Sequence, residues 1–173
     1  RLFGIDPVKQ QDWKSYARSV LVFSFVGFVV MYLILRTQSF QPFNPQDYGS
    51  MPWDVSFNTS ASFLTNTNWQ FYSGESSLSY FSQMTAMTVQ NFISAGVGMA
   101  VLVAMIRGFT RKNSGELGNF WQDMVRSVFY ILVPLAVIGT VMLLTQGVVQ
   151  TLSGFDTVKT VRVPSYLAEE VNR

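Results

Sequence analysis

The sequence Thr-Asn-Thr-Asn-Trp-Gln at residues 65–70 is a polar run without glycine, and it lies between two long hydrophobic stretches. The surrounding segment, residues 37–106, contains none of the chain's 12 lysines and arginines, and its only formal charges are Asp47, Asp54 and Glu75. A cation therefore meets attraction and no repulsion from charged side chains in this part of the chain. The run predicts the mouth of an ion pathway.

The composition favours a membrane protein. Hydrophobic residues make up 49% of the chain and charged residues 13%, against about a quarter charged in soluble domains. The chain has no cysteine and no histidine, so disulfides, thiolate metal sites and the commonest catalytic base are excluded. The net charge of +2 is too small and too segregated to indicate a nucleic-acid partner.

Three uncharged runs predict transmembrane helices. The length of each run, with its flanking residues, is close to the roughly 20 residues that a membrane helix needs. We predict the three helices over residues 14–37, 80–107 and 121–146. Small residues in the second indicate a close-packing face, and Pro134 in the third predicts a kink.

The distribution of basic residues predicts the orientation. Cytoplasmic segments carry an excess of lysine and arginine. Basic residues lie before or in the first turns of the first helix, and in or between the facing ends of the second and third: Arg1, Lys9, Lys14, Arg18, Arg107, Arg111, Lys112 and Arg126. We therefore expect residues 1–13 and 108–120 to be cytoplasmic, and the loops 38–53 and 71–79 and the tail 147–173 to be extracellular. The first residues lack the pattern of a signal peptide, and none is expected.

A short apolar segment precedes the polar run. Residues 54–64 would span about 17 Å as a helix, too short to cross a hydrocarbon core of about 30 Å. We predict a re-entrant pore helix, with Asp54 as the hydrogen-bond acceptor at its N-terminus. Its C-terminal carbonyls and the negative end of its dipole would then favour a cation beside Thr65.

Residues 65–70 are predicted to form a filter loop after this helix. Potassium filters use backbone carbonyls at the end of a short pore helix, and irregular backbone at membrane depth must line a cavity or be buried. Thr65, Asn66, Thr67 and Asn68 are the candidate potassium-binding residues. The alternative is an extracellular loop in which these side chains only form turns, and the adjacent half helix favours the filter.

Several nearby polar residues have secondary candidate roles. Trp69, Gln70 and Glu75 are candidates for supporting the filter or its entrance. Gln90 and Asn91 in the second membrane helix are candidates for helix packing or for lining a cavity. Asp123 with Arg126, and Glu169 with Glu170, are expected on solvated faces.

Longer motifs carry a family resemblance. They are SFLTNTNWQ at 62–70, YSGE at 72–75, LSYFSQM at 78–84 and TVQNF at 88–92, with GIDP at 4–7 and PFNPQ at 42–46 outside them. On these motifs the chain resembles the KdpA family, the potassium-transporting subunits of bacterial Kdp ATPases. The resemblance covers nearly everything up to about residue 150, and the tail from Thr151 adds little.

The resemblance implies a fold and an ion site. The family resembles potassium channels in having four units of helix, pore helix and helix. The chain would hold the first complete unit and one further transmembrane helix, an all-α membrane protein. The filter strand maps onto Thr65 to Asn68, with potassium at Asn66, Thr67 and Asn68 where channels have glycine. The family's second, glycine-rich filter does not follow in this sequence.

The resemblance also implies partners and a location. ATP would be hydrolysed by a separate P-type catalytic subunit, and small accessory subunits would complete the complex. Potassium is the only ion implied, and the location is the bacterial inner membrane, crossed several times. No phosphate-binding loop or phosphorylatable aspartate motif is present in the sequence, in agreement with a subunit that is not itself an enzyme.

Two other classes of function are compatible with parts of the sequence. A non-conducting scaffold or assembly subunit would use the polar loop to dock a partner. A membrane enzyme would need a nucleophile and a base, and Ser73, Ser76 and Ser77 have no histidine or cysteine beside them. The pore-helix pattern favours the ion pathway over both.

Overall fold

The computed structural model describes residues 9–111, 115–148 and 151–154. In chain order the elements are β1 (Gln11–Asp12), α1 (Trp13–Arg36), the 3₁₀-helix η2 (Gln38–Phe40), α2 (Trp53–Leu64), α3 (Gly74–Ser77), the π-helix η3 (Ser82–Thr88), α4 (Val89–Thr110), β2 (Glu116–Gly118), α5 (Phe120–Arg126), the π-helix η4 (Ser127–Leu132) and α6 (Val133–Thr145). Residues 155–173, which form the larger part of the predicted tail 147–173 and include Glu169 and Glu170, lie outside the described residues.

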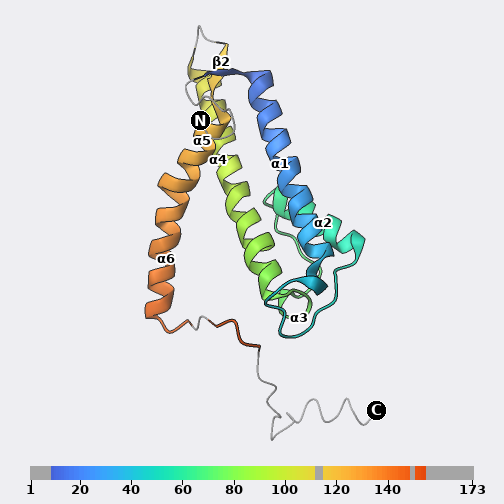
Figure 1. Ribbon diagram of the computed structural model, residues 1–173. Helices are drawn as coiled ribbons and strands as arrows, with labels where there is room; N and C mark the ends of the chain where they lie inside the picture. Colours follow the sequence, from blue (N-terminus) through green and yellow to red (C-terminus); the bar gives the residue numbers. More distant parts are fainter. Residues whose placement is uncertain (1–8, 112–114, 149–150, 155–173) are drawn as a thin grey trace, which may run out of the picture.

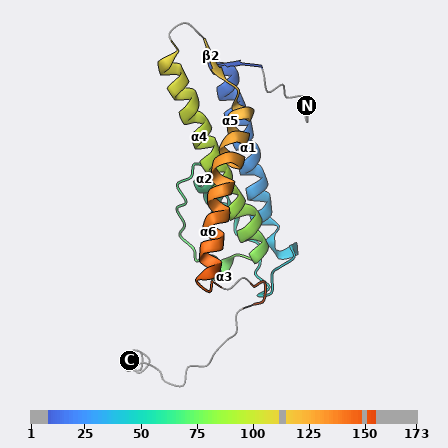
Figure 2. The same ribbon diagram turned by 90° about the vertical axis from the view of Figure 1, so that its left-hand side faces the viewer.

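Three continuous helical segments are long and apolar enough to cross a membrane: Trp13–Arg36, Ser82–Thr110 and Phe120–Thr145. They lie close to one another at one end of the molecule, where β1 and β2 pair (Figure 1 and Figure 2). We call this the strand end, and the opposite end, which carries α3, the loop end. The predicted fold, a helical membrane protein with three spans and a half helix, is confirmed.

Local signals set the limits of α1. The carboxylate of Asp12 accepts the backbone N–H of Ser15 at 3.1 Å, which caps the helix and lowers the pKa of Asp12. At the other end Arg36 lies in the last turn, where a positive charge complements the helix dipole. Its guanidinium also donates to the carbonyl of Met51, so the loop before α2 is tied to α1.

Two clusters of buried side chains hold the helices together, one toward each end. At the strand end Tyr16 of α1 packs with Phe120 and Met124 of α5 against Ala100 and Ala104 of α4. The second cluster joins α1, α2 and η3 and consists of Met31, Leu35, Met51, Phe63, Leu78, Ala86 and Met87. No residue of α6 is buried, and Figure 1 shows α6 leaning away from α1 and α4. The outer helical surfaces are apolar, as a bilayer requires.

A short antiparallel pair of strands was not predicted. Gln11 lies opposite Gly118 and Asp12 opposite Glu116, so the residues before α1 pair with those before α5. Gly118 has φ +115°, a conformation that side chains with a Cβ rarely adopt. A Cβ at Gly118 would also collide with the guanidinium of Arg107. Glycine at this position therefore lets the strand pass close over α4.

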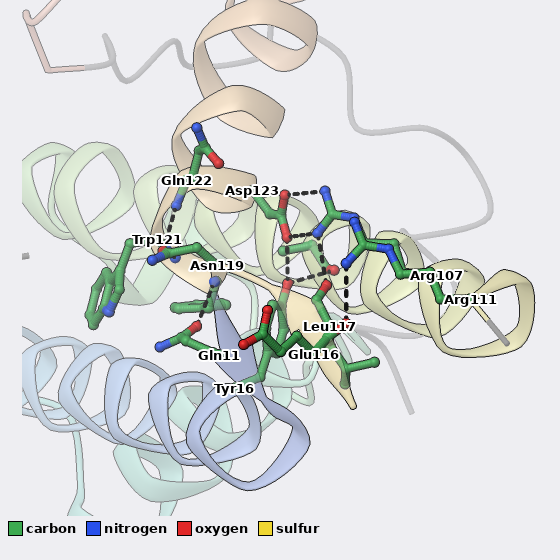
Figure 3. Close-up of polar contacts among 12 residues, drawn as sticks. Gln11, Tyr16, Arg107, Arg111, Glu116, Leu117, Asn119, Trp121, Gln122 and Asp123 are labelled. Atoms are coloured by element: carbon green, nitrogen blue, oxygen red, sulfur yellow. Dashed lines mark hydrogen bonds and ion pairs between the residues drawn. The ribbon is translucent and has the colours of Figure 1, made fainter. Parts of the chain in front are cut away.

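An ion pair between a half-buried arginine and a buried aspartate links α4 to α5 beneath these strands (Figure 3). Arg107 contacts both carboxylate oxygens of Asp123, at 2.5 and 2.8 Å, and donates to the carbonyl of Leu117 at 3.0 Å. The hydroxyl of Tyr16 lies 3.1 Å from Asp123 Oδ2 and 2.8 Å from the carbonyl oxygen of Ala100. The prediction that Asp123 lies on a solvated face is therefore wrong, because its side chain is 4% exposed and its partner is not Arg126.

The third span is irregular where proline was expected to disturb it. The π-helix Ser127–Leu132 is followed directly by α6, which has Pro134 in its first turn. Proline has no N–H to donate to the carbonyl of Tyr130, so the preceding turn loses one α-helical bond. The π-helix is rare and occurs mostly as short insertions within α-helices, as it does here.

Replacing Asp123 by alanine should destabilise the protein by about 2–4 kcal/mol, because Arg107 and Tyr16 would lose their common partner in a buried site. The control is Arg126→Ala, which removes an exposed charge from the same helix and should change stability by less than about 0.5 kcal/mol. Denaturant or thermal unfolding of the full-length protein in detergent measures both. Equal effects of the two variants would show that the ion pair does not hold these helices together.

Candidate ion-binding loop

The helix α2 positions the loop at residues 65–70. Phe57 packs edge-on against Phe28 of α1, with ring centroids 5.3 Å apart. Ser56, Thr59 and Ser60 are fully buried on its inner face. The hydroxyls of Ser56 and Ser60 donate back to carbonyls one turn earlier, at 2.8 and 2.7 Å. These bonds satisfy polar side chains that would otherwise be costly at this depth.

The start of α2 differs from the prediction. The helix begins at Trp53, Pro52 occupies the capping position, and no side chain caps it. Asp54 therefore lies in the first turn and is not the predicted hydrogen-bond acceptor. Proline fixes its own φ in the helix-compatible range, which starts the helix without a capping side chain. The carboxylate of Asp54 still lies at the positive end of the helix dipole.

The backbone N–H groups of the loop turn back onto the end of α2. Thr67 and Asn68 both donate to the carbonyl of Ser62, at 3.0 and 3.3 Å, and Asn66 donates to that of Phe63 at 3.3 Å. The hydroxyl of Ser62 also lies 2.6 Å from the amide nitrogen of Trp69 and 3.0 Å from its carbonyl oxygen. The donors of the loop are thus satisfied locally.

Asn66 and Asn68 have left-handed backbone conformations, with φ of 57° and 55°. Thr65, at the end of α2, has an ordinary negative φ of −82°, and Thr67 is not among the residues with positive φ. Asparagine tolerates the left-handed region better than other residues with a Cβ. Left-handed and ordinary backbone conformations therefore alternate along the loop, and asparagine occupies the left-handed positions that glycine usually occupies.

The carbonyl oxygens of the loop remain open. Within residues 9–111, 115–148 and 151–154, no hydrogen bond reaches the carbonyl oxygens of Thr65, Asn66, Thr67 or Asn68. All four residues are exposed on the face of this chain. Free carbonyls beside the negative end of a helix dipole can replace the water molecules around a cation.

Two residues of α4 hold the loop beside the second candidate span. The side-chain amide of Asn68 donates to the side-chain oxygen of Asn91 at 3.0 Å. The hydroxyl of Ser94 donates to the side-chain oxygen of Asn66 at 3.3 Å. Asn91 and Ser94 lie about 12–18 Å along the span that begins at Ser82. The predicted helix-packing or cavity residue Asn91 therefore contacts the loop itself.

Gln90 has a different position from Asn91. Its side chain packs against Gly27 of α1, where an added Cβ would lie 2.9 Å from Gln90 Oε1. It also lines an apolar cavity of about 210 Å³ between α1 and the segment formed by η3 and α4. Because neighbouring helix positions point about 100° apart, Gln90 faces the helix interface while Asn91 faces the loop.

The predicted supporting residues surround a neighbouring hollow. Gln70 and Glu75 both line a space of about 330 Å³ with Phe63, Tyr72 and Gln83. Gln70 donates to the hydroxyl of Tyr72 at 3.1 Å, and Glu75 accepts from Ser73 at 2.6 Å, which lowers the pKa of Glu75. Trp69 is 60% exposed and lies next to Phe71, with ring centroids 5.9 Å apart.

Ser62 and Ser94 were not singled out as site residues by the sequence. Ser62 binds the backbone of the loop and Ser94 binds Asn66. Ser62 lies one turn before the polar run and could have been inferred from its position at the end of the half helix. Ser94 carries no such signal, because it resembles the other small residues of its helix.

Comparison with known proteins identifies relatives. The family model KdpA, described as potassium-transporting ATPase A subunit, matches residues 1–170. Curated relatives named potassium-transporting ATPase potassium-binding subunit occur in Pseudomonas aeruginosa, 52% identical over 87% of this chain, and in Clostridium perfringens, 52% identical over 91%. A third, from Ralstonia pickettii, is 46% identical over 96% of this chain. The chain spans 27 to 28% of the length of these relatives.

Replacing Asn68 by valine should loosen the loop, because a β-branched side chain strains a left-handed residue by about 1–3 kcal/mol. Asn68→Gly should keep the backbone conformation, because glycine adopts it freely. Hydrogen exchange of the amides of residues 67 and 68 measures the effect, and about 5- to 150-fold faster exchange is expected for valine only.

Asn91→Ala is the matched control, because it removes the side-chain bond to Asn68 and leaves the loop sequence unchanged. If Asn68→Gly and Asn91→Ala loosen the loop as much as valine, side-chain hydrogen bonds and not the backbone conformation hold it in place.

Proposed function

Because the chain belongs to the KdpA family, the A subunits of the potassium-transporting ATPase, we propose that residues 65–68 bind potassium as one part of a selectivity filter. The proposal rests on the four backbone carbonyl oxygens of this segment, which accept no hydrogen bond from the described residues. Threonine and asparagine carbonyls would replace part of the water shell of the ion, with potassium at Asn66, Thr67 and Asn68.

The conformation of the loop supports a binding role over an ordinary surface turn. The side chains do bond within the loop, Thr65 with Thr67 and Asn68 with Asn66. In a hydrogen-bonded turn, however, a backbone carbonyl of the turn accepts from an N–H three residues later, whereas the carbonyls of residues 65–68 stay open. The contacts with Asn91 and Ser94 place this irregular backbone beside a membrane span. Such backbone persists at membrane depth only where it is covered by protein or lines an aqueous cavity.

One loop supplies only one side of a filter. The loop is exposed along its length, and the chain spans about a quarter of its relatives' length. A complete potassium site would be formed with further pore units of the same subunit, which the family resemblance puts at four. Each unit would contribute carbonyls around one axis, and this chain would contribute the first set.

The hollow beside the loop would form part of the entrance. Gln70 and Glu75 line it, and Glu75 is an exposed carboxylate that is negative at neutral pH. A negative charge at an entrance raises the local concentration of cations. Trp69 and Gln70 would support the loop from its outer side.

The sidedness follows from the basic residues. Lys14, Arg18 and Arg111 lie at the strand end, and the described residues 37–106 carry no lysine or arginine. By the positive-inside rule the strand end faces the cytoplasm and the loop end faces outside, across the bacterial inner membrane. Potassium would thus enter from outside and reach the loop first.

The energy for transport would come from a partner subunit. The relatives are named as the potassium-binding subunit of an ATPase, and this chain contains no histidine, cysteine or phosphate-binding loop. We propose that a P-type catalytic subunit hydrolyses ATP, and that small accessory subunits complete the importer. This chain selects the ion and does not itself catalyse hydrolysis.

The variant Gln70→Lys tests this function in the assembled, full-length transporter. A positive charge at the entrance should raise the potassium concentration for half-maximal ATP hydrolysis at least about tenfold, because it repels the ion at short range. Sodium should stimulate neither protein. The measurement is ATPase activity as a function of potassium and of sodium concentration.

Phe40→Lys is the control, because Phe40 is 90% exposed at the loop end and does not line the hollow. It adds the same charge and should leave the potassium response unchanged. An unchanged response of Gln70→Lys would instead favour a scaffold role for the loop, with potassium bound elsewhere.

A further inference from the structure

An apolar groove of about 700 Å³ runs between α1 and α4 at the strand end, away from the loop. Its walls include Ala17, Val20 and Leu21 of α1 and Val101, Met105 and Phe109 of α4. Leu21 is 69% exposed and Phe109 is 80% exposed, so the groove opens outward. Its size is within the range of about 300–1,000 Å³ that is usual for sites of small molecules.

Two basic side chains border this groove on α1. Lys14 and Arg18 are four positions apart and thus lie on one face of the helix, directly beside the groove-lining positions 13, 17 and 21. Both are exposed, and neither forms an ion pair with a carboxylate of the described residues. The nearby carboxylate of Asp12 caps α1 through Ser15. Asp12 also interacts electrostatically with Lys14, so an anion at this rim would meet two exposed cations and one carboxylate.

The opposite rim adds a third cation. Arg111 follows the last turn of α4, one turn beyond Gly108 of the groove, and its guanidinium donates to the carbonyl of Glu116 at 3.1 Å. The Glu116 side chain brings one negative charge to this rim. Lys14, Arg18 and Arg111 still leave the rim with a net positive charge.

The rim has the features of a membrane interface. Trp13 is 62% exposed, lines the groove and lies under the ammonium group of Lys14, 5.5 Å from the ring centroid. Tryptophan and basic residues concentrate where a helix passes from hydrocarbon to the headgroups. The apolar walls then extend from this level into the hydrocarbon layer, as an acyl chain does.

We propose that this groove binds one anionic phospholipid. Its phosphate would lie between Lys14 and Arg18, and an acyl chain would lie between α1 and α4 against Val20 and Met105. Basic pockets between membrane helices are suited to anionic headgroups, and the positive rim discriminates against neutral lipids. The site is independent of what residues 65–68 bind.

Native mass spectrometry of the full-length chain in its assembly can test this site. The probes are phosphatidylglycerol and phosphatidylcholine with identical acyl chains. Each cation near a membrane surface strengthens anionic-lipid binding about fivefold, so the double variant K14Q/R18Q should bind phosphatidylglycerol about 25-fold more weakly. Its binding of phosphatidylcholine should not change. The single variant Lys14→Gln should show the intermediate loss.

Two further variants separate the groove from general surface charge. Arg126→Gln removes an exposed charge of α5 that does not border the groove, and it should keep full binding. Gly108→Leu should weaken retention of the lipid, because the leucine side chain would occupy the groove. The substitution should be tolerated by the fold, because a Cβ at Gly108 would make only an ordinary contact with Leu117, at 3.5 Å.

Three results would overturn the proposal. Equal binding of both lipids by the wild type would exclude recognition of the headgroup. An equal loss in Arg126→Gln and Lys14→Gln would show nonspecific attraction. A wild-type assembly that retains no phosphatidylglycerol would show that a protein segment covers the groove.

Discussion

The structure depends on one constraint, which is that backbone polar groups within a membrane need partners. A helix satisfies both its backbone donors and its backbone acceptors. In residues 65–68 only the donors are satisfied, by the carbonyls of Ala61, Ser62 and Phe63. The open carbonyls are therefore acceptable only if a cation, water or other protein completes them. The half helix α2 makes this possible, because the carbonyls of its last turn accept the N–H groups of the loop.

The rest of the chain holds this segment in place. Asn91 and Ser94 fix the loop against α4, and the buried cluster around Met31 and Phe63 fixes α2 against α1. At the far end, Arg107 and Asp123 tie α4 to α5, and Tyr16 adds α1. The positions of the helices are thus determined at both ends, while α6 has no buried residue and relies on lipid or further protein for its packing.

The two ends of the bundle differ in their electrostatics. The loop end carries Asp47, Asp54 and Glu75 and one basic residue, Arg36, whereas the strand end carries Lys14, Arg18 and Arg111. The first arrangement favours entry of a cation, and the second favours contact with anionic headgroups. The same asymmetry would orient the chain by the positive-inside rule, so the proposed orientation and the proposed ion entry share an electrostatic origin.

The sequence by itself determined the membrane class, the three spans, the half helix and the polar loop that follows it. These features arise from hydrophobicity and length, which act locally along the chain. It did not determine that Asp123 pairs with Arg107, that β1 pairs with β2, or that Gln90 faces Gly27 while Asn91 faces the loop. The backbone conformation of Asn66 and Asn68 also came only from the structure. The physical reason is that these outcomes depend on how the helices are rotated and spaced against one another, and only packing across the whole tertiary structure decides that.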